Sequence, residues 1–193
     1  MDKFLFMKPV LRLISDGNFF KNVFAWFLKI LGILTAAGFL GVSYQMWKGA
    51  GDAPGRMIAG MIIIQLFIIV LGYIIVHLFF IRSSDVDSLP DAGDYKVIPL
   101  VVIASKLFGE ILAAFFSVLG IAGGLAVWIG GPMLGGVLRQ IPMLGGMSGG
   151  HVAIAGITMI IMGALYGYLF LMLFYFLAEQ IGVLVDISRN TKR

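Results

Sequence analysis

Four stretches of this 193-residue chain are each long and apolar enough to cross a lipid bilayer. Crossing the hydrocarbon core as a helix takes about 20 predominantly apolar residues. The four stretches cover residues 24–46, 57–81, 107–129 and 152–177. Because backbone polar groups in lipid need partners within the segment, uninterrupted apolar runs of this length favour helices. The sequence therefore predicts an all-α membrane protein with four transmembrane helices, forming a single membrane domain over residues 1–193.

The composition supports this fold class and excludes several others. Residues of the set AVILMFWYC make up 60% of the chain and charged residues 12%, against about 45–50% and about 25% in soluble domains. Nucleic-acid-binding proteins, coiled coils and disordered chains do not have this balance. The absence of cysteine also removes thiolate catalysis, disulfides and iron–sulfur ligation.

No catalytic or cofactor-binding motif is evident. The glycine clusters do not form a P-loop or a dinucleotide-binding fingerprint, and the spans contain no paired carboxylates or zinc-binding histidines. The two histidines, His77 and His151, are expected near opposite faces of the membrane, where they are too far apart to hold one haem. We therefore expect no enzyme activity, no cofactor and no metal.

The distribution of lysine and arginine predicts the orientation, because positive residues beside a span stay in the cytoplasm. Nine basic residues flank the spans on the side of the termini and three flank them on the other side. Both termini are therefore expected in the cytoplasm, with the protein in an inner or plasma membrane. The nine are Lys3, Lys8, Arg12, Lys21, Arg82, Lys96, Arg189, Lys192 and Arg193, and the three are Lys48, Arg56 and Arg139.

Two segments outside the spans have unusual patterns. In residues 1–21 the apolar positions recur at helical spacing beside basic ones, which predicts an amphipathic helix in the inner interface or a basic flank that snorkels. Residues 178–193 are expected as a cytoplasmic tail. The loop of residues 130–151 contains eight glycines and few polar side chains, so we expect it to be interfacial, covered by a partner, or re-entrant.

Small residues spaced by four mark a predicted contact between the last two spans. Gly120 and Gly124 lie in the third span, and Gly163 and Gly167 lie in the fourth. Such pairs let helix backbones approach closely in lipid. If the two spans are antiparallel, these glycines lie at nearly the same depth, so they are candidate packing faces.

Five ionisable residues lie within or at the ends of the spans, all on the predicted cytoplasmic side. Charged groups there are costly unless they are paired, so they are candidate functional residues. Lys106 and Glu110 share a helix face and are expected to pair, with Glu179 completing a triad. The cluster has three interpretations: mutual neutralisation that fixes helix register, an inner gate or proton relay, or independent snorkelling. The five are Lys29, His77, Lys106, Glu110 and Glu179.

Two functional hypotheses follow from these patterns. The first is a non-catalytic accessory, scaffolding or assembly subunit of a larger membrane complex. Its partners would be other membrane subunits, lipids or a second copy of this chain, and not nucleic acid. The glycine faces, the apolar loop and the two terminal segments would form its contact surfaces. The alternative is an oligomeric channel or transporter subunit with a charged gate on the cytoplasmic side.

Overall fold

The computed structural model describes residues 18–51, 53–90, 95, 97–130 and 152–191. These residues form four long α-helices: α2 (Asn18–Lys48), α3 (Gly55–Asp87), α4 (Ile98–Gly130) and α6 (Val152–Thr191). All four are long and apolar enough to cross a membrane. They indicate an integral, multi-pass membrane protein, and the predicted all-α class with four apolar helices is confirmed.

Local sequence accounts for the ends of α3. Pro54 lies directly before the helix, and its carbonyl accepts from the N–H groups of Met57 and Ile58 at 2.8 and 3.1 Å. Proline fits this N-cap position because its ring fixes φ near the −58° that Pro54 adopts, while its ψ of 146° is extended. At the other end, the N–H of Ser88 bonds to the carbonyl of Ser84 at 3.0 Å. The last turn of α3 is thereby closed.

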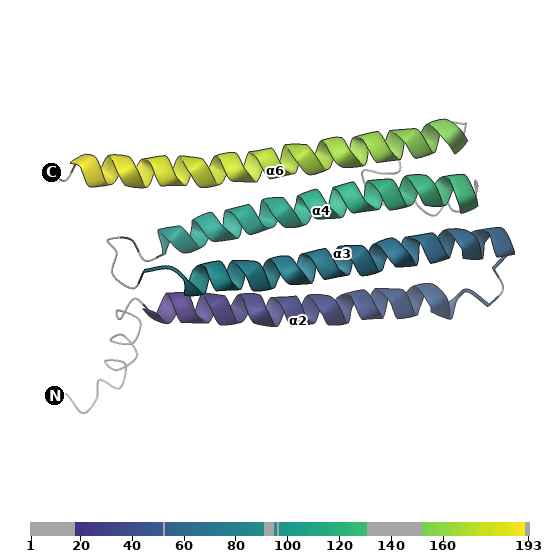
Figure 1. The fold of residues 1–193 in the computed structure, drawn as a ribbon, viewed down its shortest axis with the longest axis horizontal. Coiled ribbons are helices and arrows are strands. Elements are labelled where there is room, and N and C mark those ends of the chain that lie inside the picture. Colours follow the sequence, from purple (N-terminus) through teal and green to yellow (C-terminus); the bar gives the residue numbers. More distant parts are fainter. Residues whose placement is uncertain (1–17, 52, 91–94, 96, 131–151, 192–193) are drawn as a thin grey trace, which may run out of the picture.

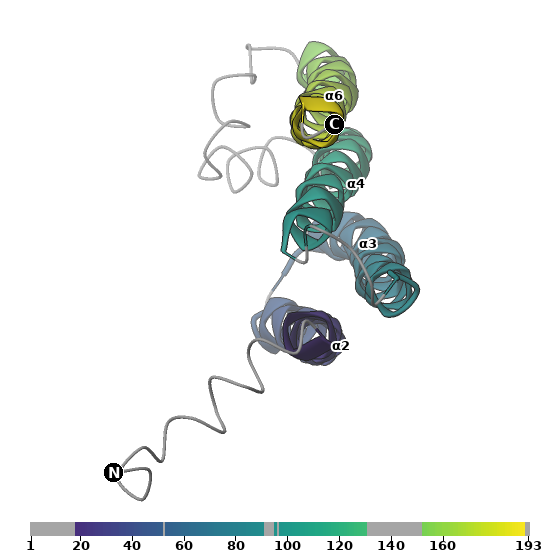
Figure 2. The ribbon, with the colours of Figure 1, turned by 90° about the vertical axis from the view of Figure 1, so that its left-hand side faces the viewer.

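The helices lie side by side in an open row and not in a closed bundle (Figures 1 and 2). Successive helices run antiparallel, and the extensive contacts join α2 to α3, α3 to α4, and α4 to α6. As a result, α2 and α6 each have one extensively packed neighbour. A smaller share of their residues is buried than in α3 and α4.

The main core fills the space between α2, α3 and α4, where α3 contacts a neighbour on either side. A smaller cluster of Val127, Ala155 and Met159 lies between α4 and α6. Because lipid is as apolar as these side chains, such cores stabilise the fold through close packing rather than through removal from water. The buried core residues are Ala25, Leu28, Leu71, Ile75, Phe79, Val86, Leu100, Ile103 and Leu107.

Each predicted span lies inside a longer helix. The first begins at Asn18, six residues before the predicted start, and the last continues to Thr191 through most of the segment expected as a tail. Hydropathy indicates where a helix leaves the hydrocarbon core. The backbone hydrogen bonds of the helix continue into the polar sequence beyond that point. The predictions for residues 1–17 and for the loop of residues 131–151 fall outside the described residues.

Candidate functional site

A cluster of polar side chains joins α3, α4 and α6 near the C-terminal end of α3. Arg82 of α3 donates to both carboxylate oxygens of Glu110 of α4, with Nε 2.9 Å from Oε2 and Nη2 bonded to Oε1. Its Nη1 donates to Asp85 Oδ2 at 2.7 Å, one turn further along α3. A bidentate arginine–carboxylate pair fixes orientation as well as distance. It therefore sets the register of α3 against α4.

The last helix joins this cluster through Tyr175. The Tyr175 hydroxyl donates to Glu110 Oε1 at 2.6 Å and accepts from Arg82 Nη2 at 3.3 Å. Lys106 of α4 places its Nζ atom 5.5 Å from the centre of the Tyr175 ring, a favourable cation–π distance. We refer to Arg82, Asp85, Lys106, Glu110 and Tyr175 as the ion cluster.

The charges of the ion cluster balance, since two basic and two acidic side chains sum to zero. The side chains of Arg82 and Glu110 are only 17% and 14% exposed. Removing two charges from water is costly, and a tight pair with further hydrogen bonds offsets that cost. The arrangement is therefore suited to holding three helices in one register.

The five ionisable residues singled out in the sequence are not brought into one cluster. Glu110 and Lys106 both belong to the ion cluster, but the carboxylate pairs with Arg82 and not with Lys106. Lys29 of α2 instead pairs with Asp87 of α3 at 3.1 Å.

The other two residues lie apart from these pairs. Glu179 is exposed on α6 and has no ion pair within the described part of the chain, so the predicted triad does not form. His77 is also exposed, and its ring stacks on Tyr73 at 5.6 Å between centroids.

Sequence reasoning missed Arg82, the residue that organises the ion cluster. It follows directly after the second apolar stretch and resembles the basic flank that ends a span. Its spacing from Asp85, three residues along one helix, was a local signal for an ion pair. Its pairing with Glu110 depends on how far α3 slides against α4, and no local pattern carries that information.

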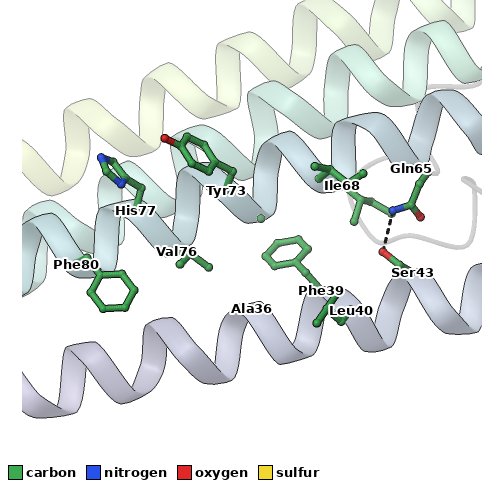
Figure 3. Close-up of a pocket in the computed structure, with 12 residues that line it drawn as sticks. Ala36, Phe39, Leu40, Ser43, Gln65, Ile68, Tyr73, Val76, His77 and Phe80 are labelled. Carbon is green, nitrogen blue, oxygen red and sulfur yellow. Dashed lines mark hydrogen bonds between the residues drawn. The ribbon is translucent and has the colours of Figure 1, made fainter.

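A groove of about 470 Å³ lies between α2 and α3 (Figure 3). It has twelve lining residues, of which only Ser43, Gln65, Tyr73 and His77 carry polar side-chain groups. The Phe39 ring projects from α2 toward α3, where Gly72 makes room for it. A Cβ atom on Gly72 would lie 3.1 Å from Phe39 Cγ, so this glycine permits the close approach.

A short hydrogen-bonded chain connects α2 and α3 at one end of this groove. Gln65 Nε2 donates to Ser43 Oγ at 3.0 Å, and Gln65 Oε1 accepts from Trp47 Nε1 at 3.2 Å. These bonds leave the second N–H of Gln65 and the O–H of Ser43 without an acceptor among the residues that the structure describes. The groove therefore has two hydrogen-bond donors at this end.

The four glycines proposed as packing residues all lie between α4 and α6. A Cβ atom on Gly120 would lie 2.7 Å from the Cα of Gly163, and one on Gly163 would lie 2.6 Å from the Cα of Gly120. Gly124 lies against the carbonyl of Gly156, and Gly167 lies against Ser117 and Ala113 of α4. The two backbones therefore touch. These glycine faces contact each other within the chain and are not available to a partner there.

Within the described ranges, no group of three or more histidine, aspartate or glutamate side chains is placed to hold a metal ion. Comparisons with protein families, with curated proteins and with solved structures find no match to this chain.

Proposed function

We propose that this chain is a non-catalytic, multi-pass subunit with an accessory, scaffolding or assembly role in a larger membrane complex. The observation that carries the proposal is the open row of helices. A closed bundle buries its own helix faces, whereas here α2 and α6 end the row with one extensively packed neighbour each. Broad helix faces are then available to other membrane subunits.

The state of the charged residues supports the same function. Arg82 and Glu110 neutralise each other, with Tyr175 bonded to both. A structural role for the cluster, holding α3, α4 and α6 in register, requires no mobile charge. The chain then presents mainly apolar helix faces to its surroundings.

The proposal includes an orientation. Both termini lie in the cytoplasm, and the membrane is an inner or plasma membrane. The excess of nine flanking basic residues over three supports this orientation, since basic loops are retained on the cytoplasmic side. The ion cluster then lies toward the cytoplasmic face.

Site-specific photo-crosslinking tests the proposed contact surfaces. A benzophenone amino acid is introduced at Leu34 of α2 or at Met172 of α6, which are 60% and 54% exposed. We expect at least one position to yield an adduct with the same identified membrane protein in intact cells and in the purified complex. Val70, an exposed residue of α3 in the middle of the row, is the matched control and should yield lipid adducts. Lipid adducts alone at all three positions would contradict the proposal.

The alternative function is an oligomeric channel or transporter subunit. One observation favours it: Arg82 and Glu110 pair inside two of the candidate spans, where ionisable groups often serve transport. In that case Lys106 and Glu110 of the ion cluster form the gate, and Glu179, which is exposed on α6 outside the cluster, contributes to ion flux from there. Glu110→Gln or Glu179→Gln would then abolish ion flux into liposomes while assembly survives. Flux that is unchanged in both variants would eliminate this alternative.

A further inference from the structure

The groove between α2 and α3 has the dimensions of a lipid chain. It extends along α3 from Gln65 toward Phe80, within two candidate spans. One leaflet of the hydrocarbon core is about 15 Å thick. The eleven helical steps from Gln65 to Val76 rise about 16 Å along the helix. A chain that enters beside Gln65 would therefore end near the stacked rings of Tyr73 and His77.

The lining of the groove selects a long apolar occupant with a polar group at one end. Most of the lining is aliphatic or aromatic, and the polar pair Gln65 and Ser43 lies at one end (Figure 3). Each of the two retains a donor without an acceptor in the described structure. Because an unsatisfied donor in hydrocarbon is costly, an occupant that brings a carbonyl oxygen is favoured.

One basic residue, Lys48, lies just beyond this end of the groove. α2 ends at Lys48, five residues past Ser43. Arg56 lies in the first turn of α3, but its Nε donates to the carbonyl of Ile129 of α4 at 2.8 Å, so its guanidinium is engaged with α4 and not with the groove. The segment from Lys48 to Arg56 carries two basic residues and one acidic residue, Asp52, and hence a net charge of +1. The acidic residues that α3 contributes to ion pairs, Asp85 and Asp87, lie at the opposite, C-terminal end of that helix.

We propose that this groove is a binding site for one glycerophospholipid. One acyl chain lies along the groove, an ester carbonyl accepts from Gln65 and Ser43, and the phosphate lies near Lys48. Trp47, whose ring nitrogen bonds to Gln65, lies at the level of the glycerol, where tryptophan is common in membrane proteins. The site differs from the surrounding lipid because it joins an apolar channel, two unsatisfied donors and a basic end.

Native mass spectrometry of the full-length protein tests this site. After exchange into a mild detergent, we expect one phospholipid to stay bound per chain. Ala36→Phe, which fills the groove, should lower that occupancy at least tenfold. The matched control is Ala37→Phe, because Ala37 is the exposed neighbour outside the groove, and it should leave the occupancy unchanged. Equal occupancy in both variants would overturn the proposal.

The polar end is tested separately, with helical content measured for every variant. Gln65→Leu combined with Ser43→Ala should lower lipid retention several-fold while the helical content stays the same. Retention of a fatty acid or another lipid without phosphate would overturn the proposed ligand class. A dimer without lipid that Ala36→Phe dissociates would instead assign the groove to a second copy of the chain, and would also overturn it.

A fluorescence measurement tests the site without any substitution among the residues that line the groove. Trp47 is kept as the sole tryptophan by Trp26→Phe and Trp128→Phe, and the protein is placed in vesicles that contain phosphatidylglycerol with brominated acyl chains. Quenching of Trp47 should saturate at a low mole fraction of the brominated lipid, as one site per chain requires. A quenching that only rises in proportion to the bulk fraction would contradict a specific site.

Discussion

Arg82 and Glu110 illustrate how single residues shape this protein. Each charge is costly in a low-dielectric environment, and their bidentate contact offsets the cost only while both are present. Lys29 and Asp87 form a pair of a different kind, because their side chains are 36% and 47% exposed. Pairs with that exposure contribute about 0–1 kcal/mol. The two pairs should therefore respond differently to substitution.

We predict that Glu110→Leu lowers the free energy of unfolding by up to about 3–5 kcal/mol, because Arg82 loses its buried partner and keeps only the more exposed Asp85. The double variant Arg82→Leu with Glu110→Leu should be more stable than Glu110→Leu alone, since it leaves neither partner of this pair as an isolated buried charge. Denaturation in mixed micelles measures both values. Lys29→Met is the control and should cost no more than about 1 kcal/mol. Strictly additive costs for Arg82 and Glu110 would contradict the pairing.

At the scale of elements, α4 and α6 meet through backbone contact at Gly120 and Gly163. Because glycine has no side chain, a glycine on each helix lets the two backbones approach more closely than any other residue would allow. Alanine generally favours a helix over glycine by about 1 kcal/mol. At this contact the clash reverses that preference, since a Cβ atom would lie within 2.7 Å of the facing backbone.

We predict that Gly163→Ala lowers the free energy of unfolding by about 1–3 kcal/mol, the usual cost of overpacking. Gly182 lies on the same helix with nothing within 4 Å of an added Cβ atom. Gly182→Ala should therefore leave stability unchanged or raise it by up to about 1 kcal/mol. Thermal unfolding of the two variants in one detergent provides the comparison. A loss of the same size at both positions would show that the contact contributes nothing.

The four helices could be predicted from the sequence because bilayer thickness imposes a minimum apolar length. Their ends could not: Asn18 and Thr191 continue helices in polar sequence, where hydropathy carries no signal. Which helices pack against each other could not be predicted either, because helix faces that contact lipid and helix faces that contact another helix are both apolar. Glycine spacing did place Gly120 and Gly163 at one depth. The partner of Glu110 was not predictable, because it depends on the axial register of α3.

At the scale of the whole molecule, an open row has two ends and two broad faces. Membrane helices gain little from hiding apolar surface in lipid, so an unclosed row is compatible with the bilayer. It also leaves α2 and α6 free to pack against other chains. In the proposed orientation, the flanking basic residues keep both termini in the cytoplasm.

Single-cysteine labelling tests the proposed orientation, and the chain has no cysteine of its own. Gly49→Cys lies at the α2–α3 turn and Asn190→Cys lies near the end of α6, both at exposed positions. A membrane-impermeant maleimide should label Gly49→Cys in intact cells and Asn190→Cys only after permeabilisation. The reverse pattern would invert the predicted topology.

The central claim is that this chain acts as one subunit of a larger membrane complex. The most direct test is the mass of the assembly isolated from its native membrane in a mild detergent, with every co-purifying chain identified. We predict a mass well above that of one chain, with at least one other membrane protein at a fixed stoichiometry. A lone, monodisperse chain without a companion would contradict the claim.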